Sequence, residues 1–536
     1  MEESVKSTKM DMDIAGGKLF NFRPAFFIAV FLGTGIAFAY CNRLYDVSAW
    51  WSFLLLLIVC IPFLFCRSLV RAKRILLAII VLTIFFCVGF FSFQVKANDF
   101  FNAGVYSGDC KVVGRVIGKE KTENGWRLTL DGVYIDGTKE NGKLVAYFSN
   151  GDGQGIALSD ELVVSGFIRT QTEWSHTDTS YYLWADDYAV TGNEFNLFLS
   201  VRGRIQTVLY AGMDETPAAV TMAVLTGDTS GMESGLLNNI RAGGVAHIFA
   251  VSGLHIGALF GACIWLIGKT KLRRTPKIFR FIFVCAVLLF YGGVCGYSPS
   301  VVRAIIVCLV VYASKLIGIG WDMLENIGVA AVLVLLLSPT ALFEVGFQLS
   351  FSACLGIALL AKPMQRTVYA FVGKISKGKL LVSKDAPPTI TQSAVRASIS
   401  FLVVTISAQI FTTPILWNAF GYLSVWSLLL NCVFVPLIGV LFSLLLFLAL
   451  VASVLPVALA SYLLFVPNVL LSAGLLFFEF FDFSSTVLSG MRLRWNSFVC
   501  YYLACTFATD KWNITRVLRA FLFSVCTIAF AISCFL

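Results

Sequence analysis

Two histidines and a serine lie close together in the most polar part of an otherwise apolar stretch. His247, Ser252 and His255 fall within GGVAHIFAVSGLHIGALFG, and the chain has only three histidines in 536 residues. A spacing of eight would place both histidines on one face of a continuous helix. Alternatively, Ser252-Gly253 interrupts the helix, and the positive N-terminus of the next half-helix then suits an anion such as phosphate. Hydrogen bonding of these groups within a helix bundle is the plainer alternative.

A second set of polar residues follows a break in another apolar run. Ser298 and Pro299 interrupt the sequence CGYSPSVVRAIIV, and Arg303 comes one turn into the helix predicted after them. Glu344 and Gln348, four residues apart, share one face of a later predicted helix. Ionisable groups at membrane depth are costly, so they pair, face water or extend to the interface. Glu344 is the predicted partner of Arg303, and extension of both side chains to the interface is the alternative.

A third polar segment combines amides with prolines. Gln409, Pro414, Asn431 and Pro436 lie in AQIFTTPILWNAFGYLSVWSLLLNCVFVP, which favours a broken helix that lines protein or water. The predicted path-lining residues of all three segments are His247, Ser252, Gly253, His255, Ser298, Pro299, Arg303, Glu344, Gln348, Gln409 and Asn431.

The composition decides which solvent surrounds these residues. Hydrophobic residues make up 58% of the chain, charged residues only 13%, and the mean hydropathy is +0.82. Soluble domains carry about 25% charged residues. The chain is therefore predicted to be a polytopic α-helical membrane protein, because only lipid can surround so much apolar surface.

Apolar segments of nearly membrane-spanning length predict about 12–13 spans. Three of them, 24–41, 50–66 and 75–95, open the chain, and the others resume at 243. Basic residues concentrate in short loops, which places those loops in the cytoplasm. The N-terminus and the lysine-rich loop 362–396 are then inside, and residues 101–200 are outside. Localisation in a bacterial cytoplasmic (inner) membrane is expected, with 101–200 extracellular or periplasmic.

Residues 101–200 differ sharply from the rest of the chain. They carry 8 Lys and Arg against 14 Asp and Glu, and short alternating runs are separated by Gly, Asn and Asp. Such alternation predicts strands, and five or six of them suit a small OB-like β-barrel or a sandwich, with the barrel favoured. Five aromatic residues are candidates for stacking nucleic-acid bases, although the acidic charge equally suits a structural or partner-docking role. They are Trp126, Tyr147, Phe148, Trp174 and Trp184.

These segments together resemble the ComEC family of DNA-uptake channels. TMAVLTGDTSGMESGLLNNIRAGGVAHIFAVSGLHIGALFG is very similar to the opening of that family's competence domain, and CGYSPSVVRA and ALFEVGFQLSF follow in the family's order. The resemblance covers roughly 20–536. It implies uptake of single-stranded DNA across the cytoplasmic membrane, as in natural transformation. The family's metallo-β-lactamase-like domain has no counterpart expected here.

The predicted organisation follows from the resemblance and the patterning together. It comprises a cytoplasmic tail (1–23), three transmembrane helices (24–98), an OB-like domain (99–196), amphipathic or ordinary connecting helices at the outer face (197–242), a channel domain (243–510) and a C-terminal helix (511–536).

No enzyme activity, metal or cofactor is expected, because the sequence contains neither a clustered metal-ligand motif nor a GxxxxGK[ST] loop. The predicted partners are single-stranded DNA, the lipid bilayer, a DNA receptor, and a separate ATPase or cytosolic DNA-pulling factor. Two other hypotheses remain open: a transporter of another anionic polymer or lipid, and a membrane-embedded enzyme that uses His247, Ser252 and His255.

Overall fold

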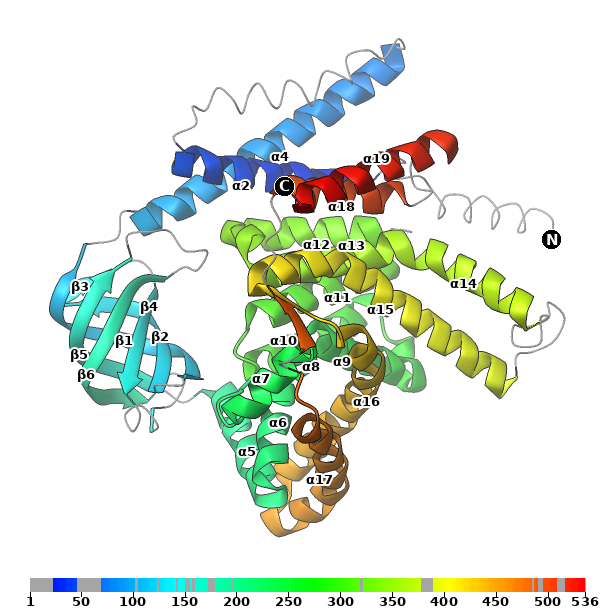
Figure 1. Cartoon of the computed structure of the whole chain (residues 1–536). Helices are drawn as coiled ribbons and strands as arrows, with labels where there is room; N and C mark the ends of the chain where they lie inside the picture. Colours follow the sequence, from blue (N-terminus) through cyan, green and yellow to red (C-terminus); the bar gives the residue numbers. More distant parts are fainter. Residues whose placement is uncertain are drawn as a thin grey trace.

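The structure is a computed structural model in which a β-barrel lies beside a large helical body (Figure 1). It describes residues 23–45, 69–101, 105–122, 125–140, 143–149, 155–156, 160–171, 179–193, 196–249, 251–318, 322–376, 389–483, 486–489, 495–508 and 516–535.

Two N-terminal helices, α2 (Pro24–Tyr45) and α4 (Leu69–Phe101), correspond to the first and third predicted spans. The second predicted span, 50–66, lies outside the described residues. The two helices cross at a pair of glycines: a Cβ atom on Gly35 would lie 2.1 Å from the Phe86 carbonyl oxygen, and one on Gly89 would lie 2.2 Å from that of Leu32. Small residues at such a crossing let two membrane helices approach closely.

The segment between α4 and α5 forms a closed five-stranded barrel, as favoured over a sandwich. Its sheet runs in the order β1–β5–β6–β4–β2 and closes through pairing of β1 with β2, while β4 and β6 are parallel. The core contains the inward residues of every strand in the ring, with Leu128, Leu144 and Tyr181 fully buried. The strands are β1 (Ser107–Thr122), β2 (Gly125–Ile135), β3 (Thr138–Lys139), β4 (Lys143–Ser149), β5 (Asp160–Thr170) and β6 (Thr179–Asn193).

The carboxylate of Glu140 links the residue that precedes β1 to strand β6. The two oxygens of Glu140 accept hydrogen bonds from the Tyr106 hydroxyl at 2.6 Å and the Tyr181 hydroxyl at 2.7 Å. The hydrogen bond to Glu140, together with burial, raises the pKa of Tyr106 to about 12. Both oxygens of this half-buried carboxylate therefore have hydrogen-bond partners.

Three helices connect the barrel to the rest of the helical body: α5 (Leu197–Gly212), α6 (Glu215–Thr226) and α7 (Ser234–Ala242). Ten of the twelve residues of α6 are buried. This differs from the amphipathic helix expected at the membrane face, because α6 is enclosed by α5, α8, α16 and α17.

The helical body is built from the remaining elements. Within the described residues, eight helical stretches are long and apolar enough to cross a membrane, and one of them, Ala246–Lys269, comprises the two helices α8 and α9. The eight are Pro24–Arg43, Leu77–Asn98, Ala246–Lys269, Lys277–Val294, Pro299–Ile317, Val345–Ile375, Ile390–Phe420 and Leu459–Phe480. The remaining elements are α8 (Ala246–Phe249), α9 (Gly253–Lys269), α10 (Lys277–Val294), α11 (Pro299–Ile317), α12 (Met323–Leu337), α13 (Val345–Gly356), α14 (Lys362–Ile375), α15 (Ile390–Phe420), β7 (Tyr422–Ser424), α16 (Ser427–Val454), α17 (Val457–Phe480), β8 (Val487–Ser489), α18 (Trp495–Phe507) and α19 (Arg516–Phe535), with short 3-10 turns at Lys271–Arg274 and Pro339–Phe343.

One stretch differs from the sequence-based prediction. The predicted loop 362–396 is largely helical, because α13 continues through a π-helical turn (Ile357–Ala361) into α14, and α15 begins at Ile390. Hydropathy alone does not register that a helix continues beyond the apolar layer.

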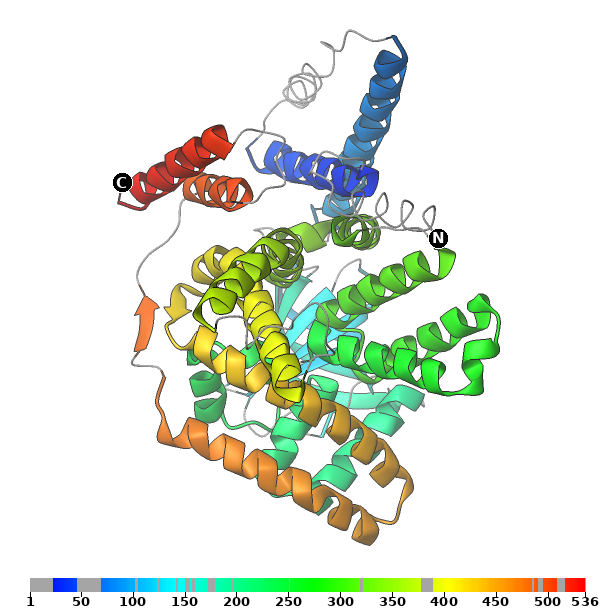
Figure 2. The same ribbon diagram turned by 90° about the vertical axis from the view of Figure 1, so that its right-hand side faces the viewer.

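The barrel and the helix pair α14–α15 lie on opposite sides of the helical body. In Figure 1 the barrel lies at the left, and the adjoining ends of α14 and α15 lie at the right. Figures 1 and 2 both place α2, α4, α18 and α19 together on one side of the body.

Candidate functional site

A broken helix forms the centre of the candidate site. Helix α8 ends at Phe249, and α9 begins at Gly253 with Ser252 as its N-cap. The interrupted alternative is therefore the one that forms, and His247 and His255 do not lie on one continuous helix. His247 is exposed although α8 packs against α6, α7 and α16, whereas His255 is fully buried.

Ser252 and His255 form a capping box in which histidine takes the place usually held by glutamate or glutamine. The Ser252 backbone N–H donates to His255 Nδ1 at 3.0 Å, and the Leu254 N–H donates to Ser252 Oγ at 3.3 Å. Acceptance at Nδ1 requires that this nitrogen carry no proton. The imidazole thus fixes the start of α9 and keeps the break open.

The turn between α10 and α11 holds the next polar residues against this break. Ser300, in the first turn of α11, donates from its hydroxyl to the Val251 carbonyl at 3.1 Å, and Ser298 Oγ lies 3.3 Å from Ser300 Oγ. Gly253 faces Ala304 of α11, and Pro299 is exposed. The sequence places Ser300 in the interruption after Ser298 and Pro299, but Ser300 was not among the predicted path-lining residues, because only the fold shows that it faces the break before α9.

Arg303 lies one turn further along α11 and pairs with Glu344. The guanidinium Nη1 and the carboxylate Oε2 are 3.6 Å apart, so the predicted partners do meet. Arg303 is buried, and Glu344 is the N-cap residue of α13. Gln348 does not join this pair, because its side-chain amide donates to the Leu342 carbonyl at 3.1 Å.

A second polar group meets the same broken segment from another direction. The Gln409 amide of α15 hydrogen-bonds Ser427 Oγ at the start of α16. Gly244, with a φ of 75°, is pressed against this helix end: a Cβ there would lie 2.5 Å from Cβ of Ser427 and 3.1 Å from that of Ser424. Only glycine fits this left-handed position and close approach. Gly244, Ser424 and Ser427 were not predicted, although the Gly-Gly pair was a visible signal.

Several oxygens of this group are buried without partners. Gln409 Oε1, Ser424 Oγ and Asn431 Oδ1 have no hydrogen-bond partner among the described residues. Asn431 is buried one turn after Ser427 on α16. Buried polar atoms of this kind call for water or a ligand.

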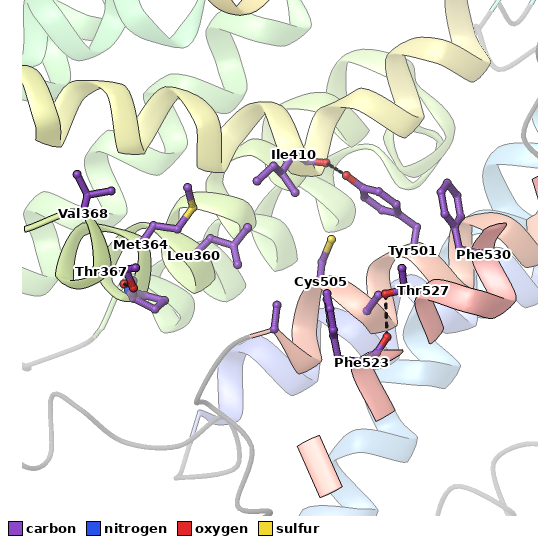
Figure 3. Close-up of a pocket in the computed structure, with 13 residues that line it drawn as sticks. Leu360, Met364, Thr367, Val368, Ile410, Tyr501, Cys505, Phe523, Thr527 and Phe530 are labelled. Atoms are coloured by element: carbon purple, nitrogen blue, oxygen red, sulfur yellow. Dashed lines mark hydrogen bonds between the residues drawn. The ribbon is translucent and has the colours of Figure 1, made fainter. Parts of the chain in front are cut away.

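Helix α15 is not broken at Pro414 but continues through it to Phe420, and the interruption predicted in this segment falls instead between α15 and α16. Proline has no N–H for the carbonyl four residues earlier, which belongs to Ile410. The Tyr501 hydroxyl of α18 donates to that carbonyl at 2.7 Å (Figure 3), and the Tyr502 hydroxyl donates to the Phe411 carbonyl at 2.7 Å. Beside them lies an apolar cavity of about 620 Å³, lined by residues that include Leu360, Met364 and Phe530.

The aromatic candidates of the barrel separate into two groups. Phe148 is buried in the barrel core, which makes its prediction as a base-stacking residue wrong, because β4 turns that side chain inward. Trp126 is half-buried with Lys119 Nζ 4.3 Å from its ring centre. Trp174 lies outside the described residues.

Tyr147 and Trp184 form part of a continuous outer stripe. Their rings stack at 6.1 Å, Trp184 also lies 6.3 Å from Phe167, and Tyr147 lies 6.3 Å from Tyr182. Phe167 and Tyr182 were missed, because cross-strand register is not visible in a single strand's pattern. We call Phe167, Trp184, Tyr147 and Tyr182 the aromatic stripe.

A metal site takes at least three close His, Cys, Asp or Glu ligands. Within the described residues, no three His, Cys, Asp or Glu side chains lie together as a metal site would require.

Helices long and apolar enough to span a membrane, a closed barrel and a broken helix surrounded by polar groups fit a multi-pass membrane protein with a polar site in its helical domain. The family model described as Competence protein matches residues 224–513, more than half of the chain. The chain therefore belongs to the competence protein family. The matched region starts within α6, earlier than the predicted channel-domain boundary at 243.

The individual proteins that resemble this chain align with it over only part of its length. ComE operon protein 3 of Bacillus subtilis is 27% identical over 285 residues, which cover 53% of this chain and 31% of that protein. Uncharacterized protein MG316 of Mycoplasma genitalium is 27% identical over 211 residues, 39% of this chain and 49% of its own. The chain thus aligns with half or less of the length of these relatives. No solved structure matches it.

Proposed function

We propose that the helical domain forms the path by which single-stranded DNA crosses the cytoplasmic membrane. The observation that carries the proposal is the broken helix α8–α9 with polar groups on two sides. Arg303 and Glu344 lie near one side, and Gln409, Ser427 and Asn431 lie near the other. A polyanion needs a hydrated path with sparse polar contacts, because dense positive charge would trap it.

The details of the break favour transport over the enzyme hypothesis. Nucleophilic catalysis needs a serine hydroxyl within reach of a histidine that acts as its base. Here the acceptor nitrogen of His255 takes the Ser252 backbone N–H, and Ser252 Oγ accepts from Leu254. Both groups therefore serve the helix end. Transport of another anionic polymer or lipid is the remaining alternative.

An uptake assay tests the proposal directly. Protein is reconstituted in vesicles whose lumen holds a single-strand-binding protein in place of the proposed pulling factor. A fluorescent single strand is then expected to enter the lumen, where it becomes protected from external nuclease. Arg303→Leu should abolish this movement. Lys315→Leu, which removes a positive charge from the exposed far end of the same helix, should leave it intact. Transport of polyphosphate or lipid by the wild type, with no movement of DNA, would favour the alternative.

We propose that the barrel is outside the cell and that the N-terminus and the 377–388 connection are inside. The barrel and the ends of α14 and α15 lie on opposite sides of the body (Figure 1), and the latter carry the excess basic charge. An impermeant thiol reagent should label Lys139→Cys in intact cells, and should label Lys374→Cys only after lysis. Unmodified protein measures the background from native cysteines. The reverse pattern would contradict this orientation.

We further propose that the barrel is of the OB type and that its aromatic stripe contacts the strand. A five-stranded ring with one parallel pair supports the first part. For the second part, strand register places Arg127 opposite Tyr147 and Arg169 opposite Tyr182, so the stripe has arginines beside it in a domain that is acidic overall. Aromatic platforms with basic flanks bind single strands. Trp184→Ala should weaken binding of an oligonucleotide by roughly 1–3 kcal/mol.

The proposed partners complete this scheme. A DNA receptor would deliver the strand, and a separate ATPase or cytosolic DNA-pulling factor would supply energy. No GxxxxGK[ST] loop occurs in these 536 residues.

A further inference from the structure

The ion pair between Arg303 and Glu344 is loose for a buried arginine. Only 5% of Arg303 is exposed, yet its nearest separation from the carboxylate is 3.6 Å, between Nη1 and Oε2. A direct charge-assisted hydrogen bond would measure about 2.7–2.9 Å. Arg303 Nε is also buried without a hydrogen-bond partner among the described residues. The guanidinium therefore retains donor capacity that its carboxylate does not use.

Other arginines of this chain show that close pairing is available to the same fold. Arg23 donates from Nε to Asp322 Oδ2 at 2.6 Å, and its Nη2 also contacts that oxygen. Arg202 Nη2 lies 2.8 Å from Asp228 Oδ2. Burial alone therefore does not explain the wider separation at Arg303, since Arg23 is equally buried.

The surroundings of Arg303 suit an anion. Its Nη2 lies against the first turn of α13, where a Cβ on Gly346 would be 2.8 Å away. The first N–H groups of a helix have no intrahelical acceptors and carry partial positive charge. Glu344, the N-cap residue of α13, makes no side-chain capping hydrogen bond with them. Arg303 and this helix end thus face one partly exposed carboxylate, whose side chain is 31% exposed.

We propose that Arg303 binds a phosphodiester of the passing strand, and that Glu344 is the counter-ion which the phosphate displaces. This inference rests on the proposed function. A guanidinium binds phosphate through paired N–H groups, which the loose contact with Glu344 leaves available. When the phosphate leaves, Glu344 returns and neutralises the arginine. Competition by the carboxylate keeps phosphate binding weak enough for the strand to move on, as conduction requires.

The salt dependence of oligonucleotide binding tests this exchange. Full-length protein in detergent is titrated with a fluorescent oligothymidylate at several salt concentrations, in a Trp184→Ala background that removes the stripe's central ring. Each phosphate contact contributes about 0.7 to the slope of log affinity against log salt for a single strand. Arg303→Gln should reduce the slope by about that amount. Glu344→Gln should instead tighten binding several-fold, because it removes the competing anion.

Two controls separate this role from a structural one. The double variant Arg23→Gln, Asp322→Asn removes an equally buried arginine and its partner, and should leave the slope unchanged. A methylphosphonate strand, which lacks backbone charge, should bind wild type and Arg303→Gln alike. Weaker binding by a folded Glu344→Gln, an unchanged slope for Arg303→Gln, or no oligonucleotide binding by the wild type would each overturn the exchange.

The outcome is distinguishable from a failure of the proposed function. Wild-type vesicles that take up no DNA would remove the channel proposal itself. Vesicles that take up DNA while the Glu344→Gln protein matches wild type in affinity and slope would remove only the phosphate exchange.

Discussion

Two helix–helix contacts of this protein each combine an arginine, a carboxylate and a glycine, but the ion pair is close in one and wide in the other. Where α2 meets α12, Arg23 pairs closely with Asp322, the Ala25 N–H donates to Glu325 Oε1 at 3.0 Å, and Gly328 admits the backbone of α2. Where α11 meets α13, Arg303 and Glu344 stand 3.6 Å apart beside Gly346.

The two contacts differ in the distance between their charged side chains. At α2–α12 the helices touch through backbone atoms, so the side chains meet at hydrogen-bonding distance. At α11–α13 the guanidinium occupies the space next to Gly346, and the carboxylate stays partly exposed. The closed contact holds the N-terminal helices against the body, whereas in the open one the guanidinium keeps N–H groups that the carboxylate does not engage.

The largest expected effect comes from forcing the closed contact apart. Gly328→Val should prevent accumulation of folded protein, because a Cβ at 328 would lie 2.4 Å from the Phe26 nitrogen and backbone atoms cannot move aside. Overpacking of this kind costs about 3 kcal/mol or more. Size-exclusion chromatography of detergent extracts measures the folded yield. Gly33→Ala on α2, where the nearest atom is 3.8 Å away, should behave as wild type.

Removing each arginine should separate stability from transport. Arg23→Gln leaves Asp322 without its close partner and should destabilise the protein by about 3 kcal/mol. Arg303→Gln should cost less than about 1 kcal/mol, because its ion pair is already open, yet it should stop DNA uptake. Thermal unfolding and vesicle uptake, measured on the same preparations, check both halves. Equal destabilisation by the two variants would mean that both contacts are structural.

A smaller effect is expected from changing His255, the capping residue at the start of α9. His255→Gln keeps a side-chain acceptor for the Ser252 N–H and should retain stability and uptake. His255→Leu removes the acceptor and should cost about 1 kcal/mol, with a larger loss of uptake because the start of α9 shifts. Melting temperature and uptake rate are the measurements. If glutamine fails as badly as leucine, the imidazole has a role beyond capping.

The smallest effect concerns the closed pair Arg202–Asp228, outside the membrane helices. Burial alone would raise the pKa of Asp228, but the Arg202 charge and hydrogen bonds from Ser230 lower it below its ordinary 3.8. The ionised carboxylate then stabilises the fold above that value, and the contribution is lost as pH falls through the folded-state pKa.

The measurement that checks this pair is melting temperature as a function of pH. Asp228→Asn should therefore be less stable than wild type near neutral pH, with the difference shrinking as pH falls below the usual carboxylate range. In an Arg202→Gln background the advantage of the carboxylate should become smaller, because only the hydrogen bonds from Ser230 then oppose the effect of burial.

The sequence by itself determined the class of this protein and the position of its parts. Low charge and long apolar runs require lipid, and alternation with Gly and Asn between α4 and α5 requires strands, because both patterns reflect local chemistry. The polar residues at 252, 303, 344, 409 and 431 were identifiable for the same reason: each interrupts an apolar run. That Arg303 would pair with Glu344 was also predictable, since few opposite charges share the membrane domain.

Only the tertiary structure decided how these residues are grouped and how far apart they stand. The break before α9 depends on the capping of Ser252 by His255, and the closeness of Gly244 to Ser427 joins residues almost two hundred positions apart. The inward turn of Phe148 and the stripe of Phe167 and Tyr182 depend on strand register. The 3.6 Å between Arg303 and Glu344 results from the packing of two helices around Gly346. Such distances are sums over many contacts, which no local pattern in the chain contains.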